Sequence, residues 1–239
     1  MTKKAIVIGA SSGIGKELAV VLAENGYEVG LMARRLHLLK ELQEQIPTKT
    51  YIGYLDISQP EEAIESVKEI LEAMGDVDLI VVNSGASFSD KILSWESEKQ
   101  TLDVNVYGFC AMASLAFRYF CHKKKGHLVG ISSIGALRGY DKAPAYTASK
   151  AFVSNYLEGL RKRAFKKGLN LVVTDVKPGF VETEMMRGTG HFWVASPRVA
   201  AEQIYRAIKN KKNHVYITRR WRLIAWLMKF LPTSIYNRM

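Results

Sequence analysis

The chain has 239 residues, of which 48% are hydrophobic, and a formal net charge of +11. This composition excludes a disordered or collagen-like chain, and the length suits one large domain or two small ones. The charge is uneven, because Glu202 is the last acidic residue and nine basic residues follow it. Such a block predicts an anionic partner, such as a membrane surface or a nucleic acid, or else a solvated cationic face.

Short apolar runs alternate with longer stretches of helical periodicity along the chain. The runs predicted to form strands are residues 5–8, 27–33, 51–55, 79–82, 127–131, 171–176 and 215–217. The stretches predicted to form helices are residues 14–25, 36–46, 61–74, 100–122, 146–167 and 197–210. Strands separated by helices indicate repeated βαβ units. We therefore expect one doubly wound α/β domain over residues 1–217, with a mostly parallel seven-stranded sheet and helices on both faces, and a tail over 218–239.

A few single residues support these boundaries and indicate the cellular compartment. Ser58 and Ser196 are predicted helix N-caps. Cys110 and Cys121 fall in one predicted helix, about 16 Å apart at 1.5 Å per residue, which is too far for a disulfide. Because the sequence also has no visible signal peptide and no long apolar run, we expect a cytoplasmic protein with reduced cysteines.

A glycine-rich loop follows the first predicted strand and opens the first predicted helix. It reads Gly9-Ala10-Ser11-Ser12-Gly13-Ile14-Gly15. Glycines permit a tight turn and a close approach of a diphosphate to the backbone, and the helix N-terminus supplies N–H groups and a positive dipole. The first gap is one residue longer than in the common dinucleotide-binding fingerprint. We expect a dinucleotide site at this loop; the alternative is a turn that binds nothing.

The second predicted strand ends at Ala33 and is followed by Arg34 and Arg35. NAD-binding folds usually place an acid near this point, where it binds the 2′-hydroxyl of the adenosine ribose. A guanidinium can instead hold a 2′-phosphate through paired hydrogen bonds, which favours NADP(H). Arg34 is the first candidate for this contact and Arg35 the second. The alternative is that both are surface residues at the start of a helix.

A serine, a tyrosine and a lysine follow one another at a spacing that suits proton transfer. Ser133 comes at the end of a predicted strand, Tyr146 follows thirteen residues later, and Lys150 lies four residues beyond Tyr146. Residues i and i+4 share a helix face, and a cation there favours tyrosinate and lowers the pKa of the phenol. A phenol tuned in this way is a good proton donor to a carbonyl that is being reduced.

In these motifs the chain resembles the short-chain dehydrogenase/reductase family, in its compact single-domain form, over nearly all of residues 3–217. The resemblance rests on an ordered set: the glycine loop, Asp56, Asn83-Ser84-Gly85, Asn105, Ser133, Tyr146-x3-Lys150 and Pro178-Gly179. It implies a Rossmann-type fold and an enzyme that moves a hydride between NADP(H) and a carbonyl or alcohol. The chain departs from the common family pattern at Ile8, where threonine is frequent, and at Val82-Asn83-Ser84-Gly85, where Asn-Asn-Ala-Gly is frequent.

The resemblance also implies roles for single residues. Tyr146 would be the catalytic acid/base, and Lys150 would bind the nicotinamide ribose and tune Tyr146. Ser133 would hydrogen-bond the substrate oxygen, and Asn105 would hold a proton-relay water. With the two arginines included, the expected cofactor-binding residues are Gly9, Ser11, Ser12, Gly13, Ile14, Gly15, Arg34, Arg35, Asp56, Ile57, Asn83, Gly85, Tyr146, Lys150, Pro178, Gly179, Val181 and Thr183.

Residues 182–196 fall where the family usually forms a substrate lid. They include Met185, Met186, His191, Phe192 and Trp193. Methionine and aromatic side chains in a lid favour an apolar or lipid-like substrate, the alternative being that they pack against the sheet. We expect no metal site, because no spacing of histidines and cysteines suggests one.

The segment Arg219–Pro232 combines basic residues with two tryptophans and several leucines. It is too short and too charged to span a bilayer, but it is typical of an interfacial helix. This predicts contact between residues 219–231 and an anionic membrane surface. The competing interpretation is that this helix packs on the domain or on a second subunit, and the sequence does not choose between them.

Together these features predict an NADP(H)-dependent oxidoreductase that acts on a small-molecule carbonyl or alcohol. The alternative is an NADP(H)-binding sensor with little catalysis, and the basic clusters 123–125 and 161–167 would also permit nucleic-acid binding. A sensor does not need proton-transfer groups, so we expect an enzyme without a nucleic-acid partner. We expect a homodimer or homotetramer in the cytoplasm, with peripheral membrane association through the tail. The sequence names neither the substrate nor the direction of the reaction.

Overall fold

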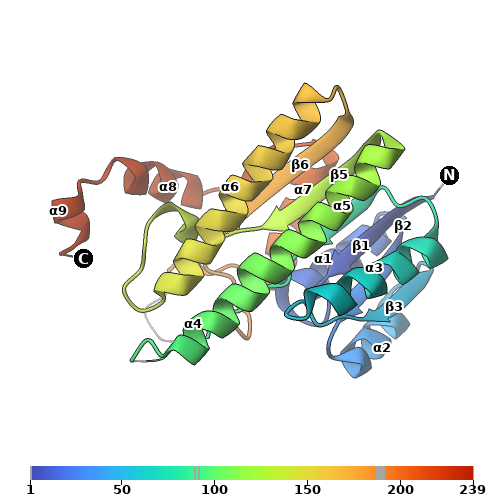
Figure 1. The fold of residues 1–239 in the computed structure, drawn as a ribbon, viewed down its shortest axis with the longest axis horizontal. Helices are drawn as coiled ribbons and strands as arrows, with labels where there is room; N and C mark the ends of the chain where they lie inside the picture. Colours follow the sequence, from blue (N-terminus) through green and yellow to red (C-terminus); the bar gives the residue numbers. More distant parts are fainter. Residues whose placement is uncertain (1, 89, 91, 187–191, 239) are drawn as a thin grey trace.

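The computed structural model describes residues 2–88, 90, 92–186 and 192–238. Its strands alternate with helices along the chain (Figure 1). The strands are β1 (Lys3–Ile8), β2 (Tyr27–Ala33), β3 (Thr50–Tyr54), β4 (Leu79–Val82), β5 (Lys125–Ile131), β6 (Asn170–Pro178) and β7 (His214–Ile217). The helices and helical turns are α1 (Gly13–Glu24), α2 (Leu36–Gln45), α3 (Pro60–Met74), α4 (Trp95–Leu102), η1 (Asp103–Gly108), α5 (Phe109–Lys123), η2 (Ile134–Leu137), α6 (Pro144–Lys166), α7 (Pro197–Lys209), α8 (Trp221–Phe230) and α9 (Thr233–Tyr236).

Within the described residues, the seven strands form one sheet in the order β3-β2-β1-β4-β5-β6-β7, and every neighbouring pair is parallel. Strands β1 to β3 follow one another from the centre of the sheet to one edge, and strands β4 to β7 follow one another from the centre to the other edge. The reversal of strand order lies between β1 and β4. In open α/β sheets ligands bind at such a reversal, outside the carboxyl ends of the strands. The predicted doubly wound α/β fold is therefore confirmed.

Helices cover both faces of the sheet, which is why its central strands are apolar without a polar face. On one side, α1, α2 and α7 pack on a core that includes Ala5 and Val7 of β1. On the other side, α3, α5 and α6 pack on a core that includes Ile6 and Ile8. The alternation of side chains along a strand thus sends successive residues of β1 into two separate cores.

The boundaries of several elements differ from those predicted. The single helix predicted for residues 100–122 is divided into α4, the π-helical turn η1 and α5. Ser58 does not cap α3: its hydroxyl donates to Asp56 (2.7 Å), and Gln59 occupies the N-cap position. The predicted cap Ser196 is confirmed, because its side chain accepts from the backbone N–H of Val199.

Beyond β7 the chain forms α8 and α9, which lie at one end of the molecule past α6 in Figure 1. None of the helices in the described ranges combines the length and the apolar character needed to cross a membrane. Cys110 and Cys121 are both free thiols, as predicted.

Candidate active site

The glycine loop lies between the end of β1 and the start of α1, beside the reversal of strand order. Gly15 approaches the loop backbone so closely that a β-carbon there would lie 2.0 Å from the carbonyl oxygen of Gly9. The side-chain amide of Asn83, at the end of β4, donates to that same oxygen (2.8 Å). Only glycine at position 15 lets the loop fold back on itself in this way, and Asn83 fixes the result to the neighbouring strand.

The N-terminus of α1 opens directly from this loop. Ser12 is the N-cap residue, but its side chain makes no capping hydrogen bond to the helix in the described structure. The first turn of α1 therefore keeps backbone N–H groups without a side-chain cap, in a helix of 12 residues. Such a helix end attracts an anion through its N–H groups and its dipole. Ile14, in the same turn, packs against the core that contains β1.

The two arginines after β2 point to different partners. The guanidinium of Arg35 donates to the hydroxyls of Ser11 (3.2 Å) and Ser12 (2.7 Å), and it pairs with Glu184 at 3.1 Å. The side chain of Arg34 is 63% exposed and lies 3.8 Å from a carboxylate oxygen of Asp56. Arg35 thus lies over the glycine loop, and Arg34 lies beside the residue expected at the adenine.

Asp56 and Ile57 follow β3 at the same edge of the sheet. The carboxylate of Asp56 accepts hydrogen bonds from the backbone N–H and the hydroxyl of Ser58, at 3.0 and 2.7 Å. Ile57 is buried, and its carbonyl oxygen would lie 2.0 Å from a β-carbon on Gly108. The loop after β3 is therefore fixed against the end of η1.

Ser133, Tyr146 and Lys150 come together where β5 ends and α6 begins. Ser133 caps η2, accepting from the backbone N–H of Gly135 at 3.0 Å, and a hydrogen bond joins its side chain to Tyr146. Lys150 lies on the same face of α6, with its Nζ 5.8 Å from the centre of the Tyr146 ring. That Nζ donates to the carbonyl oxygen of Ile131 at 3.1 Å. The three predicted side chains thus form one cluster.

Burial shifts the pKa values of this cluster in opposite directions. It lowers the pKa of Lys150 to about 8, because a buried ammonium loses its hydration. It raises the pKa of the Tyr146 phenol, and the hydrogen bond from Ser133 offsets only part of that rise. Desolvation is thus the largest cause of the shift in the pKa of Tyr146, and the predicted lowering of that pKa by Lys150 is not among its causes.

Asn105 is buried in the π-helical turn η1. Its side-chain amide donates to the carbonyl oxygen of Ala86 (2.8 Å) and to the hydroxyl of Ser149 (3.0 Å), and its oxygen accepts from the N–H of Ala86 (2.9 Å). The side chain therefore fastens the loop after β4 to α6. In that loop, a β-carbon on Gly85 would lie 2.9 Å from Nζ of Lys150.

The segment after β6 closes over the glycine loop. A β-carbon on Gly13 would lie 3.0 Å from Cγ2 of Thr183, which places Thr183 beside the start of α1. Val181 is buried and pairs with Ala195, which joins the two ends of the predicted lid. Met185, Phe192 and Trp193 are each about half exposed, and Met186 is less so. His191 lies outside the described residues.

Sequence reasoning missed Trp221, the first residue of α8. It is 3% exposed and lies against Pro178-Gly179, where a β-carbon on Gly179 would come within 2.1 Å of the indole. Its ring centre lies 5.3 Å from that of Phe180 and 5.2 Å from that of Phe192. The tail therefore contributes to the wall of the candidate site. Only its tryptophan content pointed to an unusual role.

A second omission is a buried ionic network behind Ser133. The carboxylate of Asp175 in β6 accepts from the hydroxyls of Ser132 (2.5 Å) and Ser154 (2.7 Å) and from the ammonium of Lys177. Lys177 also donates to Ser154 at 2.7 Å. Burial, with the nearby charges of Arg161 and Lys229, lowers the pKa of Lys177 to about 8. This network ties the end of β5 to β6 and α6.

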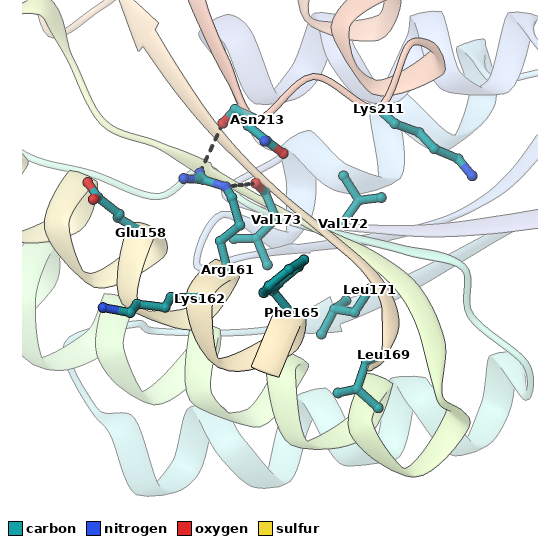
Figure 2. A pocket seen from close by; sticks show the side chains of 10 residues that line it. All are labelled: Glu158, Arg161, Lys162, Phe165, Leu169, Leu171, Val172, Val173, Lys211 and Asn213. Atoms are coloured by element: carbon teal, nitrogen blue, oxygen red, sulfur yellow. Dashed lines mark hydrogen bonds between the residues drawn. The ribbon is translucent and has the colours of Figure 1, made fainter. Parts of the chain in front are cut away.

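An open groove of about 440 Å³ lies at the opposite end of the sheet, between α6 and the start of β6 (Figure 2). Arg161 crosses it and donates to the carbonyl oxygens of Val173 (2.9 Å) and Asn213 (3.0 Å). Phe165 projects from α6 and is 85% exposed. None of the catalytic candidates lines this groove. In the described parts of the chain, no three metal-binding side chains gather into a cluster.

The chain is similar in sequence and in fold to known proteins. A model of the family described as short chain dehydrogenase matches residues 3–192. An uncharacterised oxidoreductase of Myxococcus xanthus is 36% identical over 188 residues, which cover 77% of this chain and 74% of the relative. Another from Staphylococcus saprophyticus is 31% identical over 211 residues, covering 86% and 88% of the two chains.

Solved structures share the fold at lower identity. An alcohol dehydrogenase of the archaeon Thermococcus sibiricus, in complex with 5-hydroxy-NADP, matches with a TM-score of 0.80 at 24% identity and covers 90% of this chain and 96% of its own. A short-chain dehydrogenase/reductase of Burkholderia phymatum, in complex with NAD, matches with a TM-score of 0.86 at 18% identity, covering 95% and 92%.

Proposed function

The chain belongs to the short-chain dehydrogenase family, and from that premise we propose that it is an NADP(H)-dependent oxidoreductase that reduces a carbonyl to an alcohol, or catalyses the reverse. The observation that carries the proposal is the position of the Ser133, Tyr146 and Lys150 cluster beside the glycine loop. Gly85 adjoins Lys150, and Asn83, two residues earlier, holds the glycine loop. Proton-transfer groups and a dinucleotide loop thus share one edge of the sheet.

The residues present fit a dinucleotide. The close backbone approach at Gly15 and the uncapped first turn of α1 suit a diphosphate, whose charge the helix N-terminus favours. Asp56 and Ile57 would lie at the adenine. Lys150 would bind the nicotinamide ribose, and the segment from Pro178 to Thr183 would lie over the nicotinamide.

NADP(H) is favoured over NAD(H) because the edge beside the glycine loop is cationic. Arg35 is held over Ser11 and Ser12, and Arg34 lies exposed next to it. A 2′-phosphate between the two guanidiniums could take the place of Glu184 on Arg35 and would be held by charge-assisted hydrogen bonds. A structural relative binds an NADP derivative and another binds NAD, so the arginines of this chain carry the preference.

The chemistry that NADP(H) would supply, held by the glycine loop and Lys150, is transfer of a hydride to the substrate carbonyl carbon, or its acceptance in the reverse direction. Ser133 would hydrogen-bond the carbonyl oxygen, and Tyr146 would donate its Oη proton to that oxygen as charge develops there. The raised pKa of Tyr146 keeps the phenol protonated and ready to donate. Lys150, with its pKa near 8, is mostly cationic at neutral pH and stabilises the tyrosinate that remains.

An apolar or lipid-like substrate fits the surface around the site. Met185, Phe192 and Trp193 of the lid are partly exposed, and Phe192 and Trp193 contact Trp221 beside Gly179. Large apolar side chains in a lid favour an apolar ligand. We also retain the proposals of a cytoplasmic location and a homodimer or homotetramer.

The test is to follow NADPH absorbance while a panel of apolar ketones and aldehydes is offered to the purified chain. Tyr146→Phe should lower turnover about 10²- to 10⁴-fold, the usual contribution of general acid catalysis, and leave NADPH binding intact. Equal turnover by Tyr146→Phe would contradict the mechanism. Tight NADPH binding without turnover of any substrate would instead favour the alternative, a dinucleotide sensor.

A further inference from the structure

Helix α8 has an apolar face on each side. Trp221 and Ala225 are buried against the domain. At 100° per residue, four large apolar side chains fall on the opposite side. We call them the outer face: Leu223 (71% exposed), Trp226 (66%), Leu227 (53%) and Phe230 (69%). Trp226 and Phe230 contact each other with ring centres 5.2 Å apart, so the outer face is a continuous apolar strip.

The inner side of α8 is fixed to the domain by specific contacts. Trp221 packs on Gly179 and Phe180. At the other end, the guanidinium of Arg138 donates to the carbonyl oxygen of Leu231 (3.0 Å) and lies 4.4 Å from the ring centre of Tyr236. Because both ends are held to the domain, the orientation that exposes the outer face is a property of the fold and not of a loose tail.

Positive charge borders the outer face on one flank and at the start of the helix. Arg222 and Lys229 fall on one flank of α8, separated by seven residues, and Arg219 and Arg220 precede the helix. No acidic residue follows Glu202. An anionic lipid surface satisfies both features, because it accepts apolar side chains and attracts cations. A second copy of this face would bring like charges together, and a nucleic acid would leave four apolar side chains unused.

We propose that the outer face of α8 docks on an anionic membrane surface. The four apolar side chains enter the boundary between headgroups and acyl chains, and Arg222 and Lys229 lie near lipid phosphates. Trp221, on the inner side of the same helix, contacts Phe192 and Trp193 of the lid. Docking therefore places the candidate site beside the lipid. The lipid would also supply an apolar substrate, and this part of the proposal rests on the proposed function. The docking of α8 does not depend on the proposed function.

The experiment is flotation of the purified full chain with vesicles of phosphatidylcholine, alone or mixed with phosphatidylglycerol, at low and high salt. The wild type should float with the mixed vesicles at low salt, and high salt should release it. Trp226→Ser combined with Phe230→Ser should abolish flotation. Arg222→Gln combined with Lys229→Gln should weaken binding about 30-fold, from roughly 1 kcal/mol per basic residue.

Phe165→Ser is the matched control, because Phe165 is also an exposed aromatic residue but lies at the far end of α6. It should float as the wild type does. Three results would overturn the proposal: no flotation at low salt, equal binding to neutral vesicles, or an equal loss of flotation in Phe165→Ser.

A fourth result would point to a second copy of the chain instead of a membrane. In that case the wild type would ignore vesicles and form a concentration-dependent dimer, and Trp226→Ser with Phe230→Ser would disrupt the dimer.

Circular dichroism melts of each variant show whether the outer-face variants are folded. NADPH binding by the wild type, followed by nicotinamide fluorescence, separates the two proposals. A chain that floats with anionic vesicles but binds no NADPH would support docking and contradict the proposed function. A chain that reduces carbonyls but does not bind anionic vesicles would support the proposed function and contradict docking.

Discussion

The indole of Trp221 lies directly on the backbone of Gly179, so closely that a β-carbon on residue 179 would come within 2.1 Å of it. Trp221 comes 42 positions after Gly179 along the chain; Trp221 belongs to the tail, whereas Gly179 directly follows β6. The segment proposed to lie over the nicotinamide is therefore supported from behind by the helix proposed to meet a membrane.

This contact makes position 179 intolerant of any side chain. Gly179→Ala should displace Trp221 and loosen the start of α8. We expect it to lower thermal stability and to raise the KM for NADPH, the overpacking alone costing about 1–3 kcal/mol. Circular dichroism melts and steady-state kinetics would measure both effects. Gly179→Ala combined with Trp221→Ala should recover part of the loss of Gly179→Ala, and strictly additive losses would contradict the contact.

The arginines after β2 should determine the choice of cofactor. Arg35→Gln and Arg34→Gln should each raise the KM for NADPH about 10- to 100-fold, the range for hydrogen bonds to a charged group, and leave the KM for NADH nearly unchanged. Arg35 is held over the glycine loop, so its replacement should have the larger effect. Lys40→Gln, in α2, is the control, because it removes one positive charge at a position away from the glycine loop. A wild type that prefers NADH would refute the assignment.

Acid should destabilise the fold through His127. Its Nε2 lies 2.7 Å from the hydroxyl of Thr174, which itself donates to the carbonyl oxygen of Lys212. Burial lowers the pKa of His127 from 6.5 to about 4. Between these values the unfolded chain takes up a proton that the folded chain does not, so stability falls as the pH drops.

The expected loss from this group is about 3 kcal/mol between pH 6.5 and pH 4. His127→Gln, which can still donate to Thr174, should flatten the pH dependence of urea unfolding across that interval. His214→Gln serves as the comparison, because the pKa of His214 is also lowered to about 4, although its side chain is half exposed. An unchanged slope in His127→Gln would show that another group carries the effect.

The network behind Ser133 should depend on charge pairing. Asp175→Asn leaves the Lys177 ammonium buried beside an amide, and we expect a loss of about 3–5 kcal/mol in the free energy of unfolding. Ser154→Ala removes a neutral hydrogen-bonding group from the same network and should cost about 1 kcal/mol. The double change Asp175→Leu with Lys177→Met should be more stable than Asp175→Asn. If it is less stable, the ion pair contributes net stability of its own.

The sequence predicted the sheet well, because parallel strands buried on both faces are continuous apolar runs. β2 and β4 match their predicted ranges, and β1 extends two residues before its predicted start. The division of the helix around Asn105 was not predictable: Asn105 lies in a π-helical turn, and its side chain bonds to Ala86 and Ser149, which are distant in the sequence. Local spacing carries no signal for such a contact.

The candidate catalytic cluster was predictable for a related reason. Tyr146 and Lys150 share one helix turn, and Ser133 comes at the end of a strand, so local geometry brings them close. The contact of Trp221 with Gly179 and the hydrogen bond between Asp175 and Ser154 join segments that are distant in the sequence. The residues next to them in the sequence gave no indication of these contacts. The apolar pattern around Asp175 predicted a strand but did not indicate that the carboxylate of Asp175 is buried.

The setting of Trp221 also gives the molecule an optical reporter. An indole packed against the proposed nicotinamide segment should lose fluorescence when NADPH binds, because dihydronicotinamide absorbs where tryptophan emits. Trp226, only five residues along α8, is 66% exposed and should instead shift its emission to shorter wavelength on entering lipid. The two signals arise from opposite sides of one helix, so a single cuvette could follow cofactor and vesicle together.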